Sequence, residues 1–205
     1  MNRAAPWLSL LAGLAAVLLY VGAAAWLPPA PHARVLYDGL VPAPPYRWVR
    51  PPAGYRGDNE PPKPYSAALP LRPSGSAPAE FATDDLQATL TLPGNVIAPR
   101  AGETQVRVTL TPLDPAALAP APPGRRFDGN AYRFEAVYGG SGAAVALQGP
   151  ITVVLRYAVH ATTILRLDAA GGAPAWTRLP TTVFTGSQED LAHSDTLGVF
   201  VASNP

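Results

Sequence analysis

Cysteine is absent from the 205 residues of this chain, which excludes disulfides, thiolate catalysis and cysteine-based zinc or iron–sulfur sites. Charge is also scarce. Charged residues make up 14% of the sequence, against about 25% in ordinary soluble domains, and the formal net charge is +1. No Lys/Arg cluster exceeds the pair Arg125-Arg126, so the chain has no concentration of positive charge that would attract the phosphates of a nucleic acid. Nucleic acid is therefore not an expected partner.

The first feature present is an uncharged apolar stretch of 21 residues, Trp7–Leu27. At about 1.5 Å per residue, a helix of this length spans a hydrocarbon core of roughly 30 Å. Trp7 and Trp26 suit the two membrane interfaces. We expect a transmembrane signal anchor at residues 7–27 after a short tail of residues 1–6. The alternative is a cleaved signal peptide ending near Ala23-Ala24-Ala25, whose apolar region is normally about 7 to 15 residues.

The charges around this segment give a mixed indication of its orientation. Arg3 precedes the segment, whereas Arg34, Arg47 and Arg50 follow it, which weakly opposes an N-terminus on the cytoplasmic side. A proline-rich spacer, the lack of cysteine chemistry and a β-rich pattern favour an exported C-terminal domain. We expect a single-pass membrane protein with an extracytoplasmic C-terminal domain.

Residues 28–78 hold 14 of the 26 prolines. Proline fixes φ and removes a backbone donor, so this stretch is predicted to be an extended stalk. Within it, Tyr46, Trp48, Tyr55 and Tyr65 place aromatic rings among the prolines. These rings either pack on the chain's own β domain or form a docking motif for an aromatic-lined groove. We favour packing on the chain's own domain because its effective concentration is the highest.

The remaining residues, 79–205, are predicted to form an antiparallel β-sandwich. Leu86–Leu92 and Val106–Thr111 alternate apolar and polar residues, which gives each strand one buried and one wet face, with Gln87 on the wet face. Turn residues recur every 8 to 12 positions. Further strands are expected at Ala131–Tyr138, Ala143–Leu147, Ile151–Tyr157, Thr163–Asp168, Ala175–Leu179, Thr181–Phe184 and Thr196–Ala202.

Connecting segments are predicted from proline, glycine and aspartate. Five prolines mark Pro112–Arg126 as a surface loop, in which Asp114 can cap a helical turn that begins at Pro115. Gly140–Gly142 is expected to close a hairpin. Asp84-Asp85 is expected to cap backbone donors in a turn.

Several short patterns resemble the ZU5-like β-sandwiches and related exported bacterial β-domains. They are Leu92-Pro93-Gly94, Gly149–Val153 before a strand ending in Tyr157, Trp176–Leu179, and the closing stretch His193–Ala202. The resemblance covers residues 86–202. The chain departs from the family in lacking a glycine pair before Leu86 and in having Leu197-Gly198 where the family carries Phe-Ser. The resemblance implies a non-catalytic interaction or structural module and transfers no binding residue.

Candidate catalytic and metal-binding groups are sparse, and none is assigned as a site. Gly139–Ala143 approaches the nucleophile elbow G-x-S-x-G but ends in alanine and lacks the strand–turn–helix context. The histidines His32, His160 and His193 show no metal-ligand spacing. A metal site would require His160 and His193 to converge with acids, namely Asp168, Asp190 or Asp195. No cofactor is expected.

One acidic stretch, Gln188–Asp195, precedes the last predicted strand. It is interpreted as a solvated loop, with a calcium-binding loop or a Ser/His/Asp grouping as alternatives. Calcium loops place oxygen ligands at alternate positions around a glycine turn. Neither this stretch nor Asp128-Gly129-Asn130 has that spacing.

Three functions follow as hypotheses. The first is a membrane-anchored, non-catalytic cell-envelope protein that presents its β-sandwich for a structural role or for binding a protein or glycan partner. The second is an extracytoplasmic hydrolase or carbohydrate-active domain, which requires Glu135, Asp168 or Glu189 to converge within about 5 to 10 Å. The third is a regulatory partner of a membrane complex, associating through small residues of the anchor such as Gly13, Ala16 and Ala24.

Overall fold

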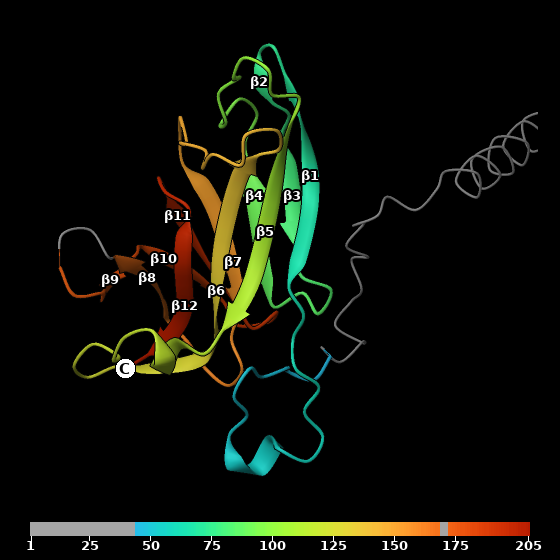
Figure 1. The fold of residues 1–205 in the computed structure, drawn as a ribbon. Coiled ribbons are helices and arrows are strands. Elements are labelled where there is room, and N and C mark those ends of the chain that lie inside the picture. Colours follow the sequence, from blue (N-terminus) through green and yellow to red (C-terminus); the bar gives the residue numbers. More distant parts are fainter. Residues whose placement is uncertain (1–43, 169–171) are drawn as a thin grey trace, which may run out of the picture. The chain divides into compact units, whose positions relative to one another are not determined.

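The computed structural model describes residues 44–168 and 172–205, which form strands and two short 3₁₀ turns (Figure 1). The turns are η1 (Ala53–Tyr55) and η2 (Pro115–Ala117). The strands are β1 (Tyr65–Arg72), β2 (Gly75–Ser76), β3 (Ala79–Ala82), β4 (Ala88–Leu92), β5 (Gln105–Leu113), β6 (Arg126–Tyr138), β7 (Ile151–Arg156), β8 (Thr163–Asp168), β9 (Ala175–Arg178), β10 (Thr181–Phe184), β11 (Glu189–Ser194) and β12 (Gly198–Asn204).

These strands form two antiparallel sheets, so the domain is all-β as the alternation predicted. The seven-stranded sheet has the order β2-β1-β5-β6-β12-β8-β9, and the five-stranded sheet has the order β10-β11-β7-β4-β3. The seven-stranded sheet is curled. At its β9 end only two residues separate β9 from β10 of the other sheet, and the Ile164 N–H of β8 donates to Thr181 Oγ1 of β10 at 2.9 Å.

Side chains from both sheets meet in one hydrophobic core. The predicted alternation in β5 is confirmed: Val106, Val108 and Leu110 are buried, whereas Arg107 is exposed. Burying a large apolar side chain contributes about 1.5–3 kcal/mol, so such strands can hold the domain without disulfides. The largest fully buried apolar and aromatic side chains are Tyr132, Phe134, Phe200, Leu90, Leu92, Ile97, Leu110, Ile151, Leu155, Ile164 and Leu165.

A second, smaller cluster covers the other face of the seven-stranded sheet. The loop between β5 and β6 folds over this face, and Trp176 Nε1–H donates to Ala119 O at 3.2 Å. The predicted turn in this loop is confirmed, because Asp114 Oδ1 accepts the Ala116 N–H at 3.0 Å and Pro115 is the first residue of η2. The buried members of the cluster are Ala119, Ala131, Leu165, Trp176, Val199 and Val201.

Most predicted strands are confirmed within a few residues, namely those at 106–111, 131–138, 151–157, 163–168, 175–179, 181–184 and 196–202. The strand predicted at Ala143–Leu147 is wrong. This stretch makes only isolated bridges, Val137↔Ala144 and Ile97↔Leu147. Its apolar residues pack against the core without joining a sheet, so alternation alone gave a misleading signal.

The predicted faces of Leu86 and Gln87 are wrong as well. Leu86 is 52% exposed and has a φ of 56°, whereas Gln87 is fully buried. The reason is the predicted aspartate turn, which is confirmed: Asp85 Oδ1 accepts the Gln87 N–H at 3.1 Å and the Thr83 hydroxyl at 2.7 Å. This turn reverses the chain before β4 begins at Ala88, and the strand alternation therefore does not extend back to Leu86.

Strands begin earlier in the chain than the predicted domain boundary at residue 79. Tyr65–Arg72, placed in the extended stalk by its prolines, is strand β1 and pairs with β5. Residues from Ala43 to Pro205 belong to one compact unit. Pro70 is tolerated because the neighbour on its other side, β2, pairs only with Leu71 and Arg72. The short strands β2 and β3 also lacked a clear sequence signal.

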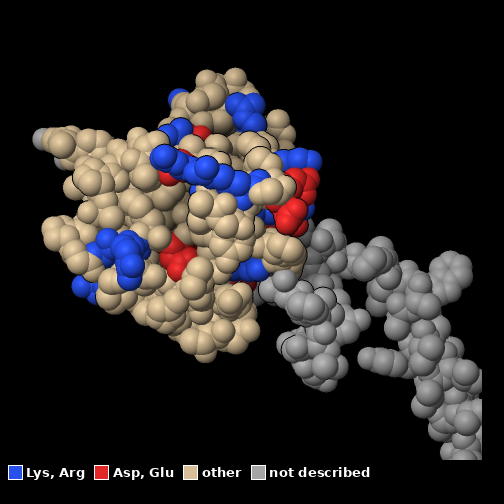
Figure 2. All heavy atoms as spheres, turned by 90° about the horizontal axis from the view of Figure 1, so that it is seen from below, with Lys and Arg blue, Asp and Glu red and all other residues tan. Residues whose placement is uncertain are grey.

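The first part of the chain lies outside the described residues. It includes the predicted anchor Trp7–Leu27 and stalk residues 28–43. Within residues 44–168 and 172–205, no helix has the length and apolar character needed to cross a membrane. On the face seen in Figure 2, the charged side chains of the described residues stand in separate groups among uncharged surface.

Candidate binding sites

An opening interrupts the seven-stranded sheet between β6 and β12. β12 begins opposite Phe134, whereas β6 continues to Tyr138. Beyond Phe134 this edge of β6 is crossed by a strap, residues 143–147, whose Val145 N–H donates to Ala136 O at 3.1 Å. A cavity of about 550 Å³, here called the wall cavity, lies between these elements; it is lined by residues 133–137, 144–147 and 195–199.

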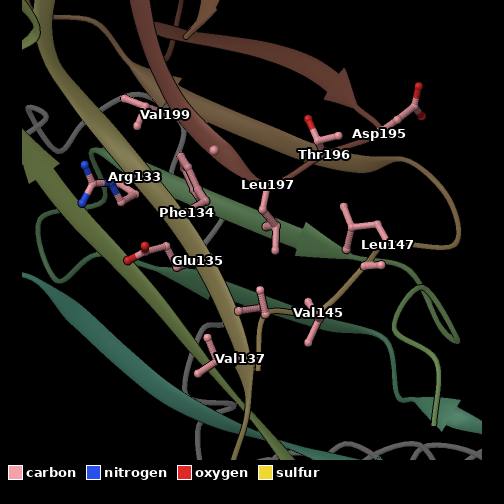
Figure 3. A pocket seen from close by; sticks show the side chains of 14 residues that line it. Arg133, Phe134, Glu135, Val137, Val145, Leu147, Asp195, Thr196, Leu197 and Val199 are labelled. Atoms are coloured by element: carbon pink, nitrogen blue, oxygen red, sulfur yellow. The ribbon is translucent and has the colours of Figure 1, made fainter. Parts of the chain in front are cut away.

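The wall cavity combines an apolar interior with a charged rim (Figure 3). Phe134 belongs to the hydrophobic core, and Val145, Leu147 and Leu197 pack against it while they line the cavity. A cavity of this kind suits an apolar side chain of a ligand, with polar groups around the cavity to hold the ligand in place. The charged lining residues are Arg133, Glu135 and Asp195.

The two carboxylates of this rim do not converge. In Figure 3 the side chains of Glu135 and Asp195 lie on opposite sides of the cavity and extend away from each other. Glycoside hydrolysis by a carboxylate pair requires both carboxyl groups to be directed at one bond. The arrangement therefore favours binding at this cavity over hydrolysis.

The three acids proposed for a hydrolase lie on different faces. Because side chains alternate along a strand and the neighbours of Glu135 point into the core, Glu135 points outward from the seven-stranded sheet. By the same reasoning Glu189 points outward from the five-stranded sheet. Asp168 bonds Arg166 on its own strand at 2.8 Å, and this bond lowers the pKa of Asp168. The structure does not bring these acids together.

The described histidines lie apart on separate elements. His193 Nδ1 is 3.1 Å from Thr152 Oγ1 at the surface of the five-stranded sheet. His160 follows β7, with its ring 6.4 Å from the Tyr157 ring. Among the described residues there is no group of three or more His, Asp and Glu side chains placed to hold a metal ion. His32 lies outside the described residues.

The glycine-rich stretch 139–143 is a tight turn after β6. The predicted chain reversal is confirmed, because the Gly142 N–H donates to Tyr138 O at 2.8 Å. Glu103 accepts the N–H groups of Gly140 at 2.7 Å and Ser141 at 2.8 Å. Hydrogen bonds from Ser141 and Gly140 lower the pKa of Glu103. This acid holds a turn, and the stretch is not a nucleophile elbow.

The solvated loop predicted at Gln188–Asp195 is wrong, because Glu189–Ser194 forms strand β11 between β7 and β10. Its inward positions are Asp190, Ala192 and Ser194, which are small or polar and thus gave no apolar alternation. Asp190 is fully buried, and no described residue donates a hydrogen bond to either carboxylate oxygen. Burial, with a smaller contribution from Asp128, raises the pKa of Asp190 to about 6.

A polar groove at the opposite end of β6 is already occupied. It is formed by Gln87, Gly129, Asn130, Tyr132 and Arg156, and we call it the Tyr46 groove because the Tyr46 side chain fills it. The Asn130 N–H donates to the Tyr46 hydroxyl at 2.9 Å, and Arg156 Nη2 donates to Pro44 O. Burial raises the pKa of Tyr46 above its usual range, so the hydroxyl stays protonated. The predicted packing of the proline-flanked aromatics on the chain's own domain is confirmed for Tyr46, whereas Tyr55 is 59% exposed.

The groove depends on an irregularity in β6. The register of the β6–β12 pair shifts between Val201 and Ser203, opposite residues 128–130. Gly129 there has a φ of +101° and Asp128 is turned into the protein, where its carboxylate accepts three backbone N–H groups, from residues 158, 159 and 160, at 2.6–2.9 Å. Bulges of this kind redirect side chains. In the sequence, the signal for this feature is an Asp-Gly-Asn triplet directly before the predicted strand 131–138.

Compared with known protein families and with curated proteins, the sequence matches none of them. The roles of the wall cavity and the Tyr46 groove are therefore argued from their geometry alone.

Proposed function

We propose that the chain is a membrane-anchored, non-catalytic protein of the cell envelope that presents a β-sandwich for binding a protein partner. In this proposal Trp7–Leu27 is a single-pass anchor, the following proline-rich residues are a spacer, and the β-sandwich is extracytoplasmic. The resemblance to ZU5-like β-sandwiches, which implies an interaction module, agrees with this role.

The observation that carries the binding role is the wall cavity. It is an opening of about 550 Å³ with a largely apolar lining. Its strap residues Ala144 and Ala146 are exposed, so a partner can reach the lining without unfolding the domain. Apolar lining with charged groups at the rim is typical of sites that accept one anchoring side chain from a protein partner.

The use of the acidic side chains supports binding over catalysis. Asp128, Asp85 and Glu103 each accept backbone N–H groups of the chain itself. Their charges therefore stabilise turns and the β6 bulge. A glycan is the less favoured partner, because sugars are usually held by exposed aromatic faces and the only aromatic lining residue, Phe134, belongs to the core.

Exposure and anchoring are tested with a C-terminally tagged chain. We expect external protease to degrade the tagged domain in intact cells. We also expect the mass of the mature product to show that residues 1–27 are still present. Protection until the cells are lysed would place the domain in the cytoplasm and refute the envelope role. A mature mass that lacks the N-terminal segment would refute the anchor.

The wall cavity is tested with a photo-crosslinking residue at Ala144 in intact cells. We expect a crosslinked product that is lost when Ala146→Trp fills the cavity and is kept when Ala68→Trp places the same bulk on an exposed position of β1. A product that persists in the Ala146→Trp chain would contradict binding at the cavity. A product whose added mass is removed by glycosidases would assign the site to a glycan.

A further inference from the structure

The segment 44–49 lies on the domain as a bound peptide lies on a receptor. It is outside the strands, and its backbone is held by side chains. Asn130 Oδ1 accepts the Val49 N–H at 2.8 Å, and Asn130 Nδ2 donates to Arg47 O at 2.7 Å. One carboxamide thereby pairs with both polar groups of an extended backbone, as a neighbouring strand would. Contacts of this kind do not depend on which molecule carries the segment.

The segment also brings its own ordered shape. Asn59 Oδ1 accepts the Trp48 N–H at 2.8 Å, and Asn59 Nδ2 donates to Trp48 O at 2.9 Å. The ring centroids of Tyr46 and Trp48 are 4.8 Å apart, and Arg47 forms an ion pair with Glu60 at 2.9 Å. Residues 46–60 are therefore partly organised by contacts among themselves while the segment lies in the groove.

The groove is shaped for the tyrosine side chain. A Cβ atom at Gly129 would lie 2.2 Å from the Tyr46 hydroxyl oxygen, closer than any non-bonded contact allows. Gly124 offers a matched comparison: it also has a positive φ, +72°, but a Cβ there would meet nothing within 4 Å. Only at residue 129 does the absence of a side chain create the space for the segment.

The chain's own segment leaves part of the groove unsatisfied. Gln87 Nε2 and Arg156 Nε are buried and have no hydrogen-bond partner among the described residues. A buried donor without an acceptor is unfavourable, so the groove holds the segment less tightly than a fully paired groove would, whichever copy supplies it. Only residues 61–64 separate this organised stretch from β1, and at about 3.1 Å per residue they span roughly 12 Å. If the contacts of Asn59 and Glu60 with Trp48 and Arg47 also open, residues 50–64 can extend roughly 45 Å. That length is sufficient to reach a neighbouring molecule.

We propose that the Tyr46 groove is a peptide-binding site for the segment Pro44–Val49, and that the segment of a second copy of this chain replaces the chain's own. Two copies are then linked by segment exchange. This site is separate from the wall cavity, and the proposal does not depend on the proposed function. The internal segment has the higher effective concentration, so exchange requires a high local concentration of copies.

The first test uses the full chain in detergent with Tyr46→Ala (Y46A), which empties the groove, and a fluorescent synthetic peptide of residues 43–60. We expect the peptide to bind the Y46A chain at least tenfold more tightly than the wild-type chain. Adding Gly129→Ala should weaken this binding at least tenfold, whereas adding Gly124→Ala should leave it unchanged. Equal effects of the two glycine substitutions, or equal binding of a scrambled peptide, would overturn the proposal.

A second test keeps the proposal falsifiable if the Y46A chain does not fold. Trp48 and Val159 line one cavity beside the groove, and the chain has no cysteine of its own. A chain with Trp48→Cys is mixed with a chain with Val159→Cys under mild oxidation. We expect mixed disulfide dimers, reduced several-fold by Gly129→Ala in the Val159→Cys chain but not by Gly124→Ala there. Absence of mixed dimers, or their insensitivity to Gly129→Ala, would overturn segment exchange.

Discussion

The wall cavity and the Tyr46 groove lie at opposite ends of the same strand, β6, and differ in how they are filled. The groove is lined by polar groups and is covered by the chain's own segment, whereas the wall cavity is lined by apolar groups and stays open. Buried polar atoms are costly unless they have partners, so a polar groove must be completed to be stable. An apolar opening leaves no donor or acceptor unpaired, and it can therefore remain available to another molecule.

The largest expected effect is at the β6 bulge, which supports the Tyr46 groove. Asp128→Ala removes the acceptor of three backbone N–H groups and should lower the free energy of unfolding by about 4 kcal/mol. Urea denaturation measures this loss. The control is Asp84→Ala, which changes an exposed acid in a nearby turn and should cost less than about 0.5 kcal/mol. Similar losses for the two variants would contradict the distinction between a buried structural acid and a surface acid.

The next effect tests whether Tyr46 and Gly129 contact each other. Gly129→Ala should cost about 2 kcal/mol more stability than Gly124→Ala, because both introduce a side chain at positive φ but only the first meets the Tyr46 hydroxyl. In a Y46A background the difference should shrink to the backbone cost alone, since φ is +101° at Gly129 and +72° at Gly124. This double-mutant cycle isolates the contact. An unchanged difference in the Y46A background would show that Gly129 acts through the backbone alone.

A third effect, of similar size, concerns the pH dependence of stability. Burial raises the pKa of Asp190 to about 6, whereas an unfolded aspartate has a pKa of about 3.9. The folded protein thus holds this proton more tightly, so the contribution of Asp190 is most favourable below about pH 4 and is lost as pH rises to about 6. Two pKa units correspond to about 2–3 kcal/mol.

The measurement is the difference in unfolding free energy between wild-type chain and Asp190→Asn across pH 4 to 8. Asparagine cannot titrate, so the difference reports Asp190 alone. It should change between about pH 4 and 6 and then level off, because above that range Asp190 is ionised in both the folded and the unfolded chain. Acids with lowered pKa values, Glu103 and Asp168, act in the opposite direction but cancel in the difference. Asp195→Asn, which removes an exposed carboxylate, is measured beside it as the reference variant. A flat profile for Asp190→Asn would contradict its burial as an unpaired acid.

The smallest expected effect is at the wall cavity. Ala146→Trp adds bulk to an open, exposed position and should change the free energy of unfolding by less than about 0.5 kcal/mol. Thermal denaturation of this variant beside Ala68→Trp measures it. A loss comparable to that of Gly129→Ala would mean that the cavity is as tightly packed as the groove.

Regular alternation made much of the fold predictable. In β5 and β7 each inward position is apolar, so the sequence alone located these strands and their buried faces. Strand β11 was not predicted because its inward positions are Asp190, Ala192 and Ser194, which are small or polar. Strand β1 was not predicted because prolines at 64, 70 and 73 indicated a stalk. Both strands form because neighbouring strands supply hydrogen bonds and burial that no local pattern records.

The sites were less predictable than the strands. The sequence placed aromatic side chains near the domain and predicted that they pack on it, which Tyr46 does. It did not indicate Asn130 or Gly129 as their partners, because those residues are more than 80 positions away. The wall cavity also had no local signal, since it exists only where β12 begins short of the end of β6.

By itself, the sequence determined the all-β class, the absence of cysteine chemistry, and the turns made by glycine, proline and aspartate. These follow from local rules: side-chain alternation, restricted φ angles and short-range capping. Tertiary structure alone decided that Asp190 is buried, that Gln87 points inward, and that one end of β6 is covered while the other stays open. Such outcomes depend on which segments far apart in the sequence come into contact. The local sequence pattern of one segment does not show which distant segment it will contact.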